Sequence, residues 1–341
     1  APSSIPISTL PTTMWQGVNH FVLLAIPFFI LMGDLALASG VTQRLVDVAK
    51  AWIGHIHGGL AHVSVSVNIV MAGMSGSDLA DAAATGKLLI PAMKRAGYPV
   101  AYAASIIAGA AMIGPLIPPS IAFILYAAAT EASVGRLFLG GAIPGALLGL
   151  LLMLQAYVQA RRNNFPREPK ATFGERVRTT AVGLPVLLIP AVVLGSILSG
   201  IATPTEAAVL GVLAVIVTGG FIYREMTPGT FARQVLATSR TMGSVFLIIA
   251  AAAVFGRVLT LYGVADGLAT WMTGITRDPA VFLFAVIVLK TEIVRSSTEP
   301  SRIPARTPRM IDRGAMKAKA TRVMRPVVAM RSQMKLLTSV L

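Results

Sequence analysis

Long apolar stretches separated by short polar segments dominate the first 289 residues of this chain. Five of these stretches are long enough to cross a bilayer as helices, because a spanning helix needs roughly 20 apolar residues. They lie at about 19–39, 137–159, 181–199, 204–223 and 241–262. The pattern predicts an all-α polytopic membrane protein.

Two further apolar regions are interrupted in the middle. Residues 61–92 are broken at Ser75-Gly76-Ser77, and each of the two arms, at about 15 residues, is too short to cross the bilayer comfortably. Residues 99–129 are broken by a segment rich in glycine and proline, Gly114-Pro115-Leu116-Ile117-Pro118-Pro119-Ser120. One proline would suffice for a kink, so this cluster favours an unwound segment over the simpler alternative of a kinked helix.

The distribution of Lys and Arg predicts which side each loop faces, since short loops rich in these residues stay in the cytoplasm. The loop 161–178 has six of them, and a second such loop is marked by Arg224, Arg233 and Arg240. Tracing backward from these loops makes 99–129 one broken crossing and puts both ends of 61–92 on the cytoplasmic side. Residues 61–92 are therefore predicted to form a re-entrant hairpin with its tip near the membrane midplane. Irregular backbone at that depth is tolerated only where it lines a cavity or is buried in protein.

The tip of this hairpin is the first candidate for chemistry. Carbonyls at the end of the first arm can ligate a cation, and amides at the start of the second arm can hold an anion together with nearby hydroxyls. Acidic side chains at this depth are costly and usually functional. A hairpin tip facing a broken helix is how secondary transporters build their sites. The candidate substrate- and ion-binding residues are Ser75, Gly76, Ser77, Asp78, Asp81, Gly114, Pro115, Pro118, Pro119 and Ser120. The alternative is that Ser75 or Ser77 merely caps a helix, with Asp78 completing the cap.

Three ordered motifs also carry a resemblance to a known family. They are Ser75-Gly76-Ser77-x-x-Ala80-Asp81-x-Ala83-Ala84-x-Gly86, Gly114-Pro115-x-Ile117-Pro118-Pro119-Ser120 and Gly200-Ile201-Ala202-Thr203-Pro204-Thr205-Glu206-Ala207-Ala208. Together they resemble the DctM-like large membrane subunit of TRAP transporters, the tripartite ATP-independent periplasmic transporters. The resemblance covers about 15–289.

The resemblance implies an ion-transporter-type fold and a sodium-coupled elevator mechanism. The solutes it implies are small organic acids, such as dicarboxylates, delivered by a periplasmic substrate-binding protein. In the same way, the resemblance implies a small permease subunit as the second partner and the bacterial inner membrane as the location. It also implies sodium as the coupling ion, with no further cofactor. The substrate itself is left open, because in such a family the soluble partner does much of the selecting.

The sequence departs from the family pattern in three places. Asp78 stands where members more often have a small neutral residue. One or two family helices are expected to be missing at the start. The second inverted repeat is expected to be incomplete, because the apolar sequence gives way at Lys290 to one rich in Arg, Pro, Ser and Thr. The sequence thus predicts a TRAP-type membrane domain at 1–289 that inserts without transporting, followed by a basic, disordered tail at 290–341.

Composition and charge agree with this division of the chain. Of the 341 residues 55% are hydrophobic and only 13% are charged, against about 25% charged in soluble domains. The net charge of +15 could suggest nucleic acid as a partner, but the tail alone holds twelve Lys and Arg against three Asp and Glu. We interpret this tail as an out-of-frame end of the sequence. The alternative is a segment that binds anionic lipid at the membrane surface. The absence of cysteine excludes disulfides and thiolate metal sites.

Two alternatives to a transporter are considered. One is a non-transporting membrane remnant, and the other is an intramembrane enzyme using Asp78 and Asp81 as acid and base. The enzyme is less favoured, since a general base usually needs histidine or further acids nearby.

No metal site is predicted from His55, His57 and His62, because their spacing does not bring them to one helix face. Glu206 is interpreted as part of a helix cap, and Asp34 as a candidate for a polar contact with the transport domain.

Overall fold

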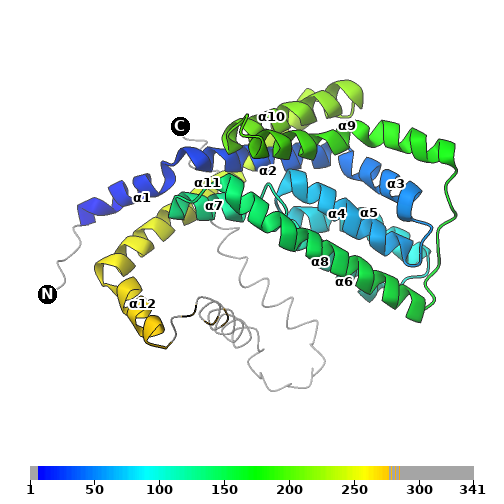
Figure 1. Ribbon diagram of the computed structural model, residues 1–341. Helices are drawn as coiled ribbons and strands as arrows, with labels where there is room; N and C mark the ends of the chain where they lie inside the picture. Colours follow the sequence, from blue (N-terminus) through cyan, green and yellow to red (C-terminus); the bar gives the residue numbers. More distant parts are fainter. Residues whose placement is uncertain (1–6, 276–277, 279–280, 282–283, 285–341) are drawn as a thin grey trace, which may run out of the picture. The chain divides into compact units, whose positions relative to one another are not determined.

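The computed structural model describes residues 7–275, 278, 281 and 284, and all secondary structure in these residues is helical (Figure 1). The predicted all-α class is thereby confirmed. The chain divides into two compact units, Ala1–Tyr262 and Gly263–Leu341. In the second unit the structure describes α12 (Val264–Ile275). The predicted tail at 290–341 and the incomplete second repeat lie outside the described residues and stay predictions.

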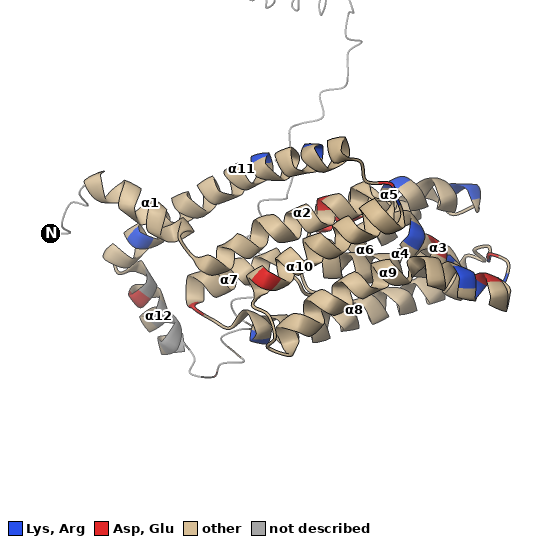
Figure 2. Cartoon of the chain, turned by 90° about the horizontal axis from the view of Figure 1, so that it is seen from above, with Lys and Arg blue, Asp and Glu red and all other residues tan. Residues whose placement is uncertain are grey.

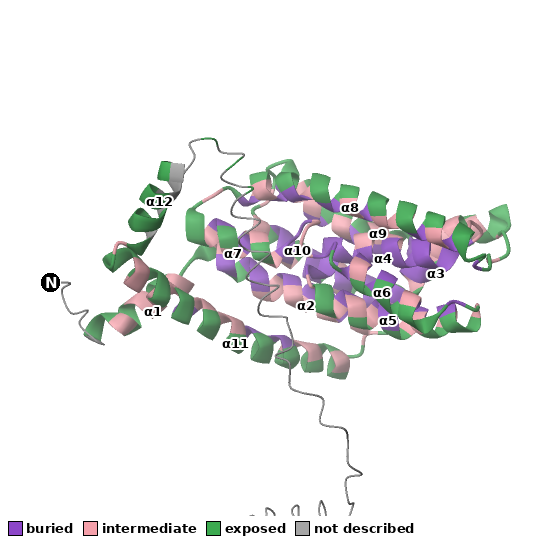
Figure 3. Cartoon of the chain, turned by 90° about the horizontal axis from the view of Figure 1, so that it is seen from below, coloured by how far each residue is buried: buried purple, intermediate pink, exposed green. Residues whose placement is uncertain are grey.

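The five predicted spans are all present as helices of the first unit. Among the described residues, five helices are long and apolar enough to cross a membrane. They are α2 (Ala25–Ala38, preceded by a 3₁₀ turn at Phe21–Leu24), α8 (Val134–Arg162), α9 (Phe173–Leu198), α10 (Pro204–Ile216, extended by a π-helical turn at Val217–Ile222) and α11 (Pro228–Leu261). Large apolar residues are exposed along α8 and α11, and Figure 3 shows exposed positions along both helices, as expected for helices that face lipid.

The predicted hairpin is formed by α4 (Gly59–Ser75) and α5 (Asp78–Arg95), which pack against each other. Its arms have 17 and 18 residues and are slightly longer than predicted. The chain turns between them at Gly76, whose φ of +58° favours glycine. Lys and Arg gather at the end of the unit where α5 and α8 end and α9 begins (Figure 2). This clustering agrees with the predicted cytoplasmic side.

The predicted broken crossing consists of α6 (Val100–Ala111) and α7 (Ile121–Thr130), separated by the Gly- and Pro-rich segment 112–120. α7 begins at a polar cap, since Ser120 Oγ accepts a hydrogen bond from Phe123 N at 3.4 Å. The prediction of an unwound segment in place of a simple kink is confirmed, because the helix stops before the first proline and restarts after the last.

Three glycines on one face of α8 bring this helix close to the hairpin and to the broken crossing. They recur every fourth residue, at Gly141, Gly145 and Gly149. A Cβ atom at Gly141 would lie 2.2 Å from the Phe123 ring, and one at Gly149 would lie 2.9 Å from Ile69 of α4. A larger residue at Gly141 would also meet the main-chain carbonyl oxygen of Leu116, 2.6 Å from its Cβ, and would therefore force α8 away from the broken crossing, whereas the end of the Ile69 side chain can shift to make room at Gly149.

Two helices of the first unit were not predicted from the sequence, α1 (Leu10–Val18) and α3 (Val41–Ile53). α1 packs on α11, and α3 packs between α9 and the hairpin helix α4. Both are shorter than a membrane span, and α3 carries charged residues along one face. A search for long apolar stretches therefore passes over them.

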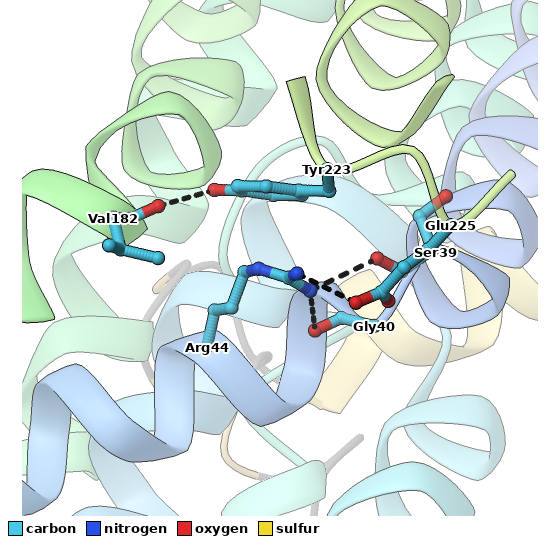
Figure 4. Close-up of polar contacts among 6 residues, drawn as sticks. All are labelled: Ser39, Gly40, Arg44, Val182, Tyr223 and Glu225. Carbon is cyan, nitrogen blue, oxygen red and sulfur yellow. Dashed lines mark hydrogen bonds and ion pairs between the residues drawn. The ribbon is translucent and has the colours of Figure 1, made fainter. Parts of the chain in front are cut away.

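Arg44 of α3 links the break between α2 and α3 to the segment after the π-helical turn that extends α10, and through Tyr223 to α9 (Figure 4). Its Nη2 lies 2.7 Å from Oε1 of Glu225, and its Cζ lies 3.7 Å from the ring centre of Tyr223. Nη1 also donates to the carbonyl of Gly40 at 3.1 Å, at the break itself. The Tyr223 hydroxyl donates to the carbonyl of Val182 in α9 at 2.6 Å. The junction thus joins α3 to α9 and to the segment after α10.

This junction predicts an acid-sensitive contribution to stability. The hydrogen bond from Arg44 holds the pKa of Glu225 below its ordinary value, against a smaller opposing effect of burial. A depressed pKa means that the contribution is present above the unfolded-state pKa, about 4.3, and is lost as pH falls through the folded-state value. The Glu225 side chain is 45% exposed, so the ion pair should contribute no more than about 1 kcal/mol.

We therefore expect Arg44→Gln to lower the thermal unfolding midpoint at pH 7, because the ion pair and the contact with Tyr223 are both lost. The difference from wild type should be smaller at about pH 3 than at pH 7, because the contribution of the ionised Glu225 is lost progressively as the pH falls below the unfolded-state pKa of about 4.3. Thermal unfolding of the detergent-solubilised chain at both pH values measures this. A difference that stays constant with pH would mean that Glu225 does not contribute through its charge.

Candidate functional site

The hairpin tip lies directly against the broken crossing. A Cβ atom at Gly76 would lie 2.6 Å from the carbonyl oxygen of Pro119, and one at Gly114 would lie 3.4 Å from Asp81 Oδ2. Pro118 and Pro119 are buried, and Pro115 is half-buried within the same segment. The structure therefore brings the two interruptions identified in the sequence into one site.

Asp81 is the buried centre of this site. It is 0% exposed, and its Oδ1 accepts a hydrogen bond of 2.6 Å from the Ser75 hydroxyl. Among the described residues, its Oδ2 has no hydrogen-bond partner. Burial of a carboxylate is costly unless a cation or further donors compensate it. The unpaired Oδ2 therefore makes Asp81, together with Ser75, a candidate site for binding a cation.

Ser77 and Asp78 have a different role at the start of α5. Ser77 Oγ accepts from Ala80 N at 3.4 Å, and Asp78 Oδ1 accepts from Leu79 N at 2.8 Å. The alternative of a helix cap thus describes Ser77 and Asp78, whereas Ser75 is bound to Asp81. Two amides that were predicted to hold an anion already have acceptors within the protein. Binding of a substrate carboxylate at these amides stays a prediction.

The two carboxylates of the enzyme alternative also differ in environment. Asp78 is exposed and bonds to its own helix, whereas Asp81 is buried and faces Ser75. An acid and base pair would need both groups to reach one reacting molecule. The described geometry gives them separate partners.

A pocket of about 170 Å³ opens between the tip and three other helices. Its lining combines tip residues with residues of α2, α7 and α11, namely Ile30, Gly33, Asp34, Ser75, Ser77, Ala80, Ile121 and Thr241. Asp34 Oδ2 accepts a hydrogen bond of 2.8 Å from Thr238 of α11. Asp34 was singled out as a charge within a span, whereas no sequence signal pointed to Thr238 or Thr241.

Glu206 has the structural role that was predicted for it. Its Oε2 accepts from Thr203 N at 2.7 Å, and its own amide donates to Thr203 Oγ1 at 3.3 Å. This reciprocal pair is a capping box that begins α10. The third motif of the sequence is therefore a helix start and adds no group to the candidate site.

A helical hairpin whose tip meets an unwound helix, within a bundle of helices long and apolar enough to span a membrane, is the arrangement on which secondary transporters build their sites, and it places the chain in that class. The family model described as "Tripartite ATP-independent periplasmic transporter, DctM component" matches residues 2–291. The chain belongs to this family, and it is a multi-pass protein of the inner membrane.

Individual relatives agree with this assignment. The chain is 39% identical over 297 residues to the C4-dicarboxylate TRAP transporter large permease protein DctM of Pseudomonas aeruginosa, covering 87% of this chain and 69% of that protein. It is 36% identical to the 2,3-diketo-L-gulonate TRAP transporter large permease protein YiaN of Escherichia coli, with 84% and 68% covered. It is 35% identical to the sialic acid TRAP transporter large permease protein SiaM of Vibrio cholerae, with 84% and 67% covered. These relatives are permeases, which favours transport over the enzyme alternative.

Proposed function

We propose that this chain is the membrane subunit of a sodium-coupled secondary transporter that takes up small organic acids by an elevator-type movement. It works with a small permease subunit and with a periplasmic protein that binds the solute and delivers it. The observation that carries this proposal is the buried Ser75–Asp81 pair at the contact between hairpin tip and broken crossing. Family membership supports the transport part of the proposal.

The tip supports cation binding through its chemistry. Asp81 Oδ2 supplies a negative charge without a protein partner, and Ser75 supplies a hydroxyl beside it. Carbonyls of an unwound segment are ligands for sodium in transporters of this kind, and the Pro119 carbonyl lies against Gly76. A bound sodium ion would neutralise the carboxylate and hold the two interruptions together. Tip and broken crossing would then form one rigid surface for the solute.

The pocket beside the tip supports a small solute. Its volume of about 170 Å³ is below the range of roughly 300–1,000 Å³ of pockets for drug-sized ligands. The three relatives are named for a C4-dicarboxylate, for 2,3-diketo-L-gulonate and for sialic acid, so the class of small organic acids is proposed and no single substrate. Asp34 is the charged residue of this lining. A positively charged group that attracts a substrate carboxylate must therefore come from outside these eight residues.

The movement is proposed from the position of the pocket. One wall belongs to the hairpin and α7, and the other wall belongs to α2 and α11. A site between two such walls can open to either side of the membrane when one wall slides past the other. Uptake by vesicles that contain this chain and both partners tests this proposal against the expectation, from the sequence, that the chain inserts without transporting. Uptake that requires an inward sodium gradient would support the proposal. Equal uptake with potassium in place of sodium would contradict the coupling.

The two serines of the tip provide the direct test of the cation site. Ser75→Ala should raise the half-saturating sodium concentration about tenfold or more, because a hydrogen bond to a charged group is worth about 1.5–3 kcal/mol. Ser77→Ala should leave that concentration unchanged and cost about 1 kcal/mol of stability through the lost cap. Sodium titrations of the thermal unfolding midpoint, at constant ionic strength with choline, measure both. Equal sodium responses in the two variants would contradict the assignment of Ser75.

A further inference from the structure

A second polar link joins the two hairpin arms below the tip. Asn68 of α4 and Thr85 of α5 are both 0% exposed. Asn68 Nδ2 donates to the Ser64 carbonyl at 2.8 Å and to Thr85 Oγ1 at 3.4 Å. The link therefore runs across the interior of the hairpin from one arm to the other.

This link ends on the residue at the centre of the candidate site. Thr85 Oγ1 donates to the main-chain carbonyl of Asp81 at 2.6 Å, while the Asp81 carboxylate accepts from Ser75. Asp81 is thus held at its side chain by the tip and at its main chain by Thr85, which is itself joined to Asn68. Both connections reach back to α4, so the two arms are tied on either side of Asp81.

Packing alone does not account for an asparagine at this position. Among the described residues, Asn68 Oδ1 has no hydrogen-bond partner, although the residue is fully buried. An unsatisfied buried carbonyl is destabilising, and replacing both partners of a buried hydrogen bond by apolar groups of similar shape can be neutral or stabilising. A leucine facing a valine would fill the same space. The polar pair must therefore contribute something other than fold stability.

Apolar contacts cannot fix the orientation of one hairpin arm relative to the other, as this hydrogen-bonded pair does. They are not directional, so helices that meet only through aliphatic side chains can rotate or slide by small amounts. Successive residues of a helix differ in direction by about 100°. A small rotation of α5 would therefore turn Asp81 away from Ser75 and from the broken crossing.

We propose that Asn68 and Thr85 are positioning residues that fix the register of the two hairpin arms, so that Asp81 and Ser75 face the cation together. This inference rests on the proposed function, since it assigns the pair to the geometry of the sodium site. Neither residue touches the ion. They act through the main chain of Asp81.

The double variant Asn68→Leu with Thr85→Val separates this role from a structural one. Its unfolding midpoint in choline should equal or exceed that of the wild type, because the unsatisfied carbonyl is removed together with its partner. Its half-saturating sodium concentration should rise about fivefold or more. Affinity and stability are thus expected to change in different directions, which a merely structural pair would not produce.

Two single variants serve as controls. Thr85→Ser keeps the hydroxyl and should keep the sodium affinity of the wild type. Thr130→Val removes a hydroxyl that makes the same bond to a carbonyl four residues back, to Tyr126 O at 2.8 Å, but at the exposed end of α7. This change should leave the sodium response unaltered. If the double variant fails to fold, Thr85→Val compared with Thr85→Ser gives the same contrast.

The outcomes are distinct. A wild-type protein whose midpoint does not respond to sodium would overturn the proposed cation site and this inference with it. A wild-type response that the double variant fully retains would overturn the inference alone. A parallel loss of stability and sodium affinity, shared by Thr85→Ser, would assign the pair to folding and also overturn it.

Discussion

The variant Asp81→Asn is expected to lose nearly all of its response to sodium, with the half-saturating concentration raised about 100-fold. Asparagine has the shape of aspartate and keeps an oxygen that can accept the bond from Ser75. It removes only the negative charge that a bound cation would neutralise. In choline the variant should be at least as stable as the wild type, because an uncompensated buried charge has been removed.

Asp78→Asn is the matched control for this experiment. Asp78 lies three residues earlier on the same helix, but its side chain is exposed and bonded to Leu79 N. The sodium dependence of its unfolding midpoint should equal that of the wild type. If both variants kept the wild-type response, the cation would have to bind elsewhere, and the Ser75–Asp81 pair would be only a contact within the hairpin.

Gly76→Ala is expected to have the largest effect on stability. The residue has a φ of +58°, and its Cβ would lie 2.6 Å from the Pro119 carbonyl oxygen. The left-handed conformation costs a non-glycine residue about 1–2 kcal/mol, and overpacking of a close contact adds about 1–3 kcal/mol. The colliding atom belongs to the main chain and has no side-chain rotamer available to relieve the contact. The thermal unfolding midpoint in sodium measures the sum.

Gly200→Ala isolates the conformational part of this effect. Gly200 has a φ of +74°, and no atom of the described residues lies within 4 Å of its Cβ position, so the variant should show only the cost of the left-handed conformation. Its midpoint should therefore fall distinctly less than that of Gly76→Ala. Equal decreases would contradict the close contact between hairpin tip and broken crossing.

The length of apolar stretches was sufficient to predict the framework of the fold. Five stretches near 20 residues became five long helices, and two stretches with interruptions became the hairpin and the broken crossing. Gly76 and the prolines at 115, 118 and 119 mark these interruptions through backbone chemistry that does not depend on distant residues. The contact between the two interruptions was expected from the way secondary transporters build their sites.

The detailed roles within the site depend on three-dimensional packing and were less predictable. Ser75 and Ser77 are equivalent in the sequence, but one turns inward to Asp81 and the other caps α5. Thr238 bonds to Asp34 from 204 positions away, a distance over which no local pattern operates. The hydrogen bond between Asn68 and Thr85 could not be predicted from the sequence, because it depends on how the two hairpin arms are aligned. α3 was passed over because it is short and partly charged.

The glycine face of α8 has a consequence for how the chain is assembled during synthesis. α4 and α5 leave the ribosome before α8 does, and the face of α4 that carries Ile69 is covered by α8 at Gly149. With 17 and 18 residues, the two arms are at the short end of the length that can span a bilayer. We expect the hairpin to reach its final packing only once α8 has arrived to form its wall. A segment translated early would then be completed by one translated late, so the site would not assemble in the order of the chain.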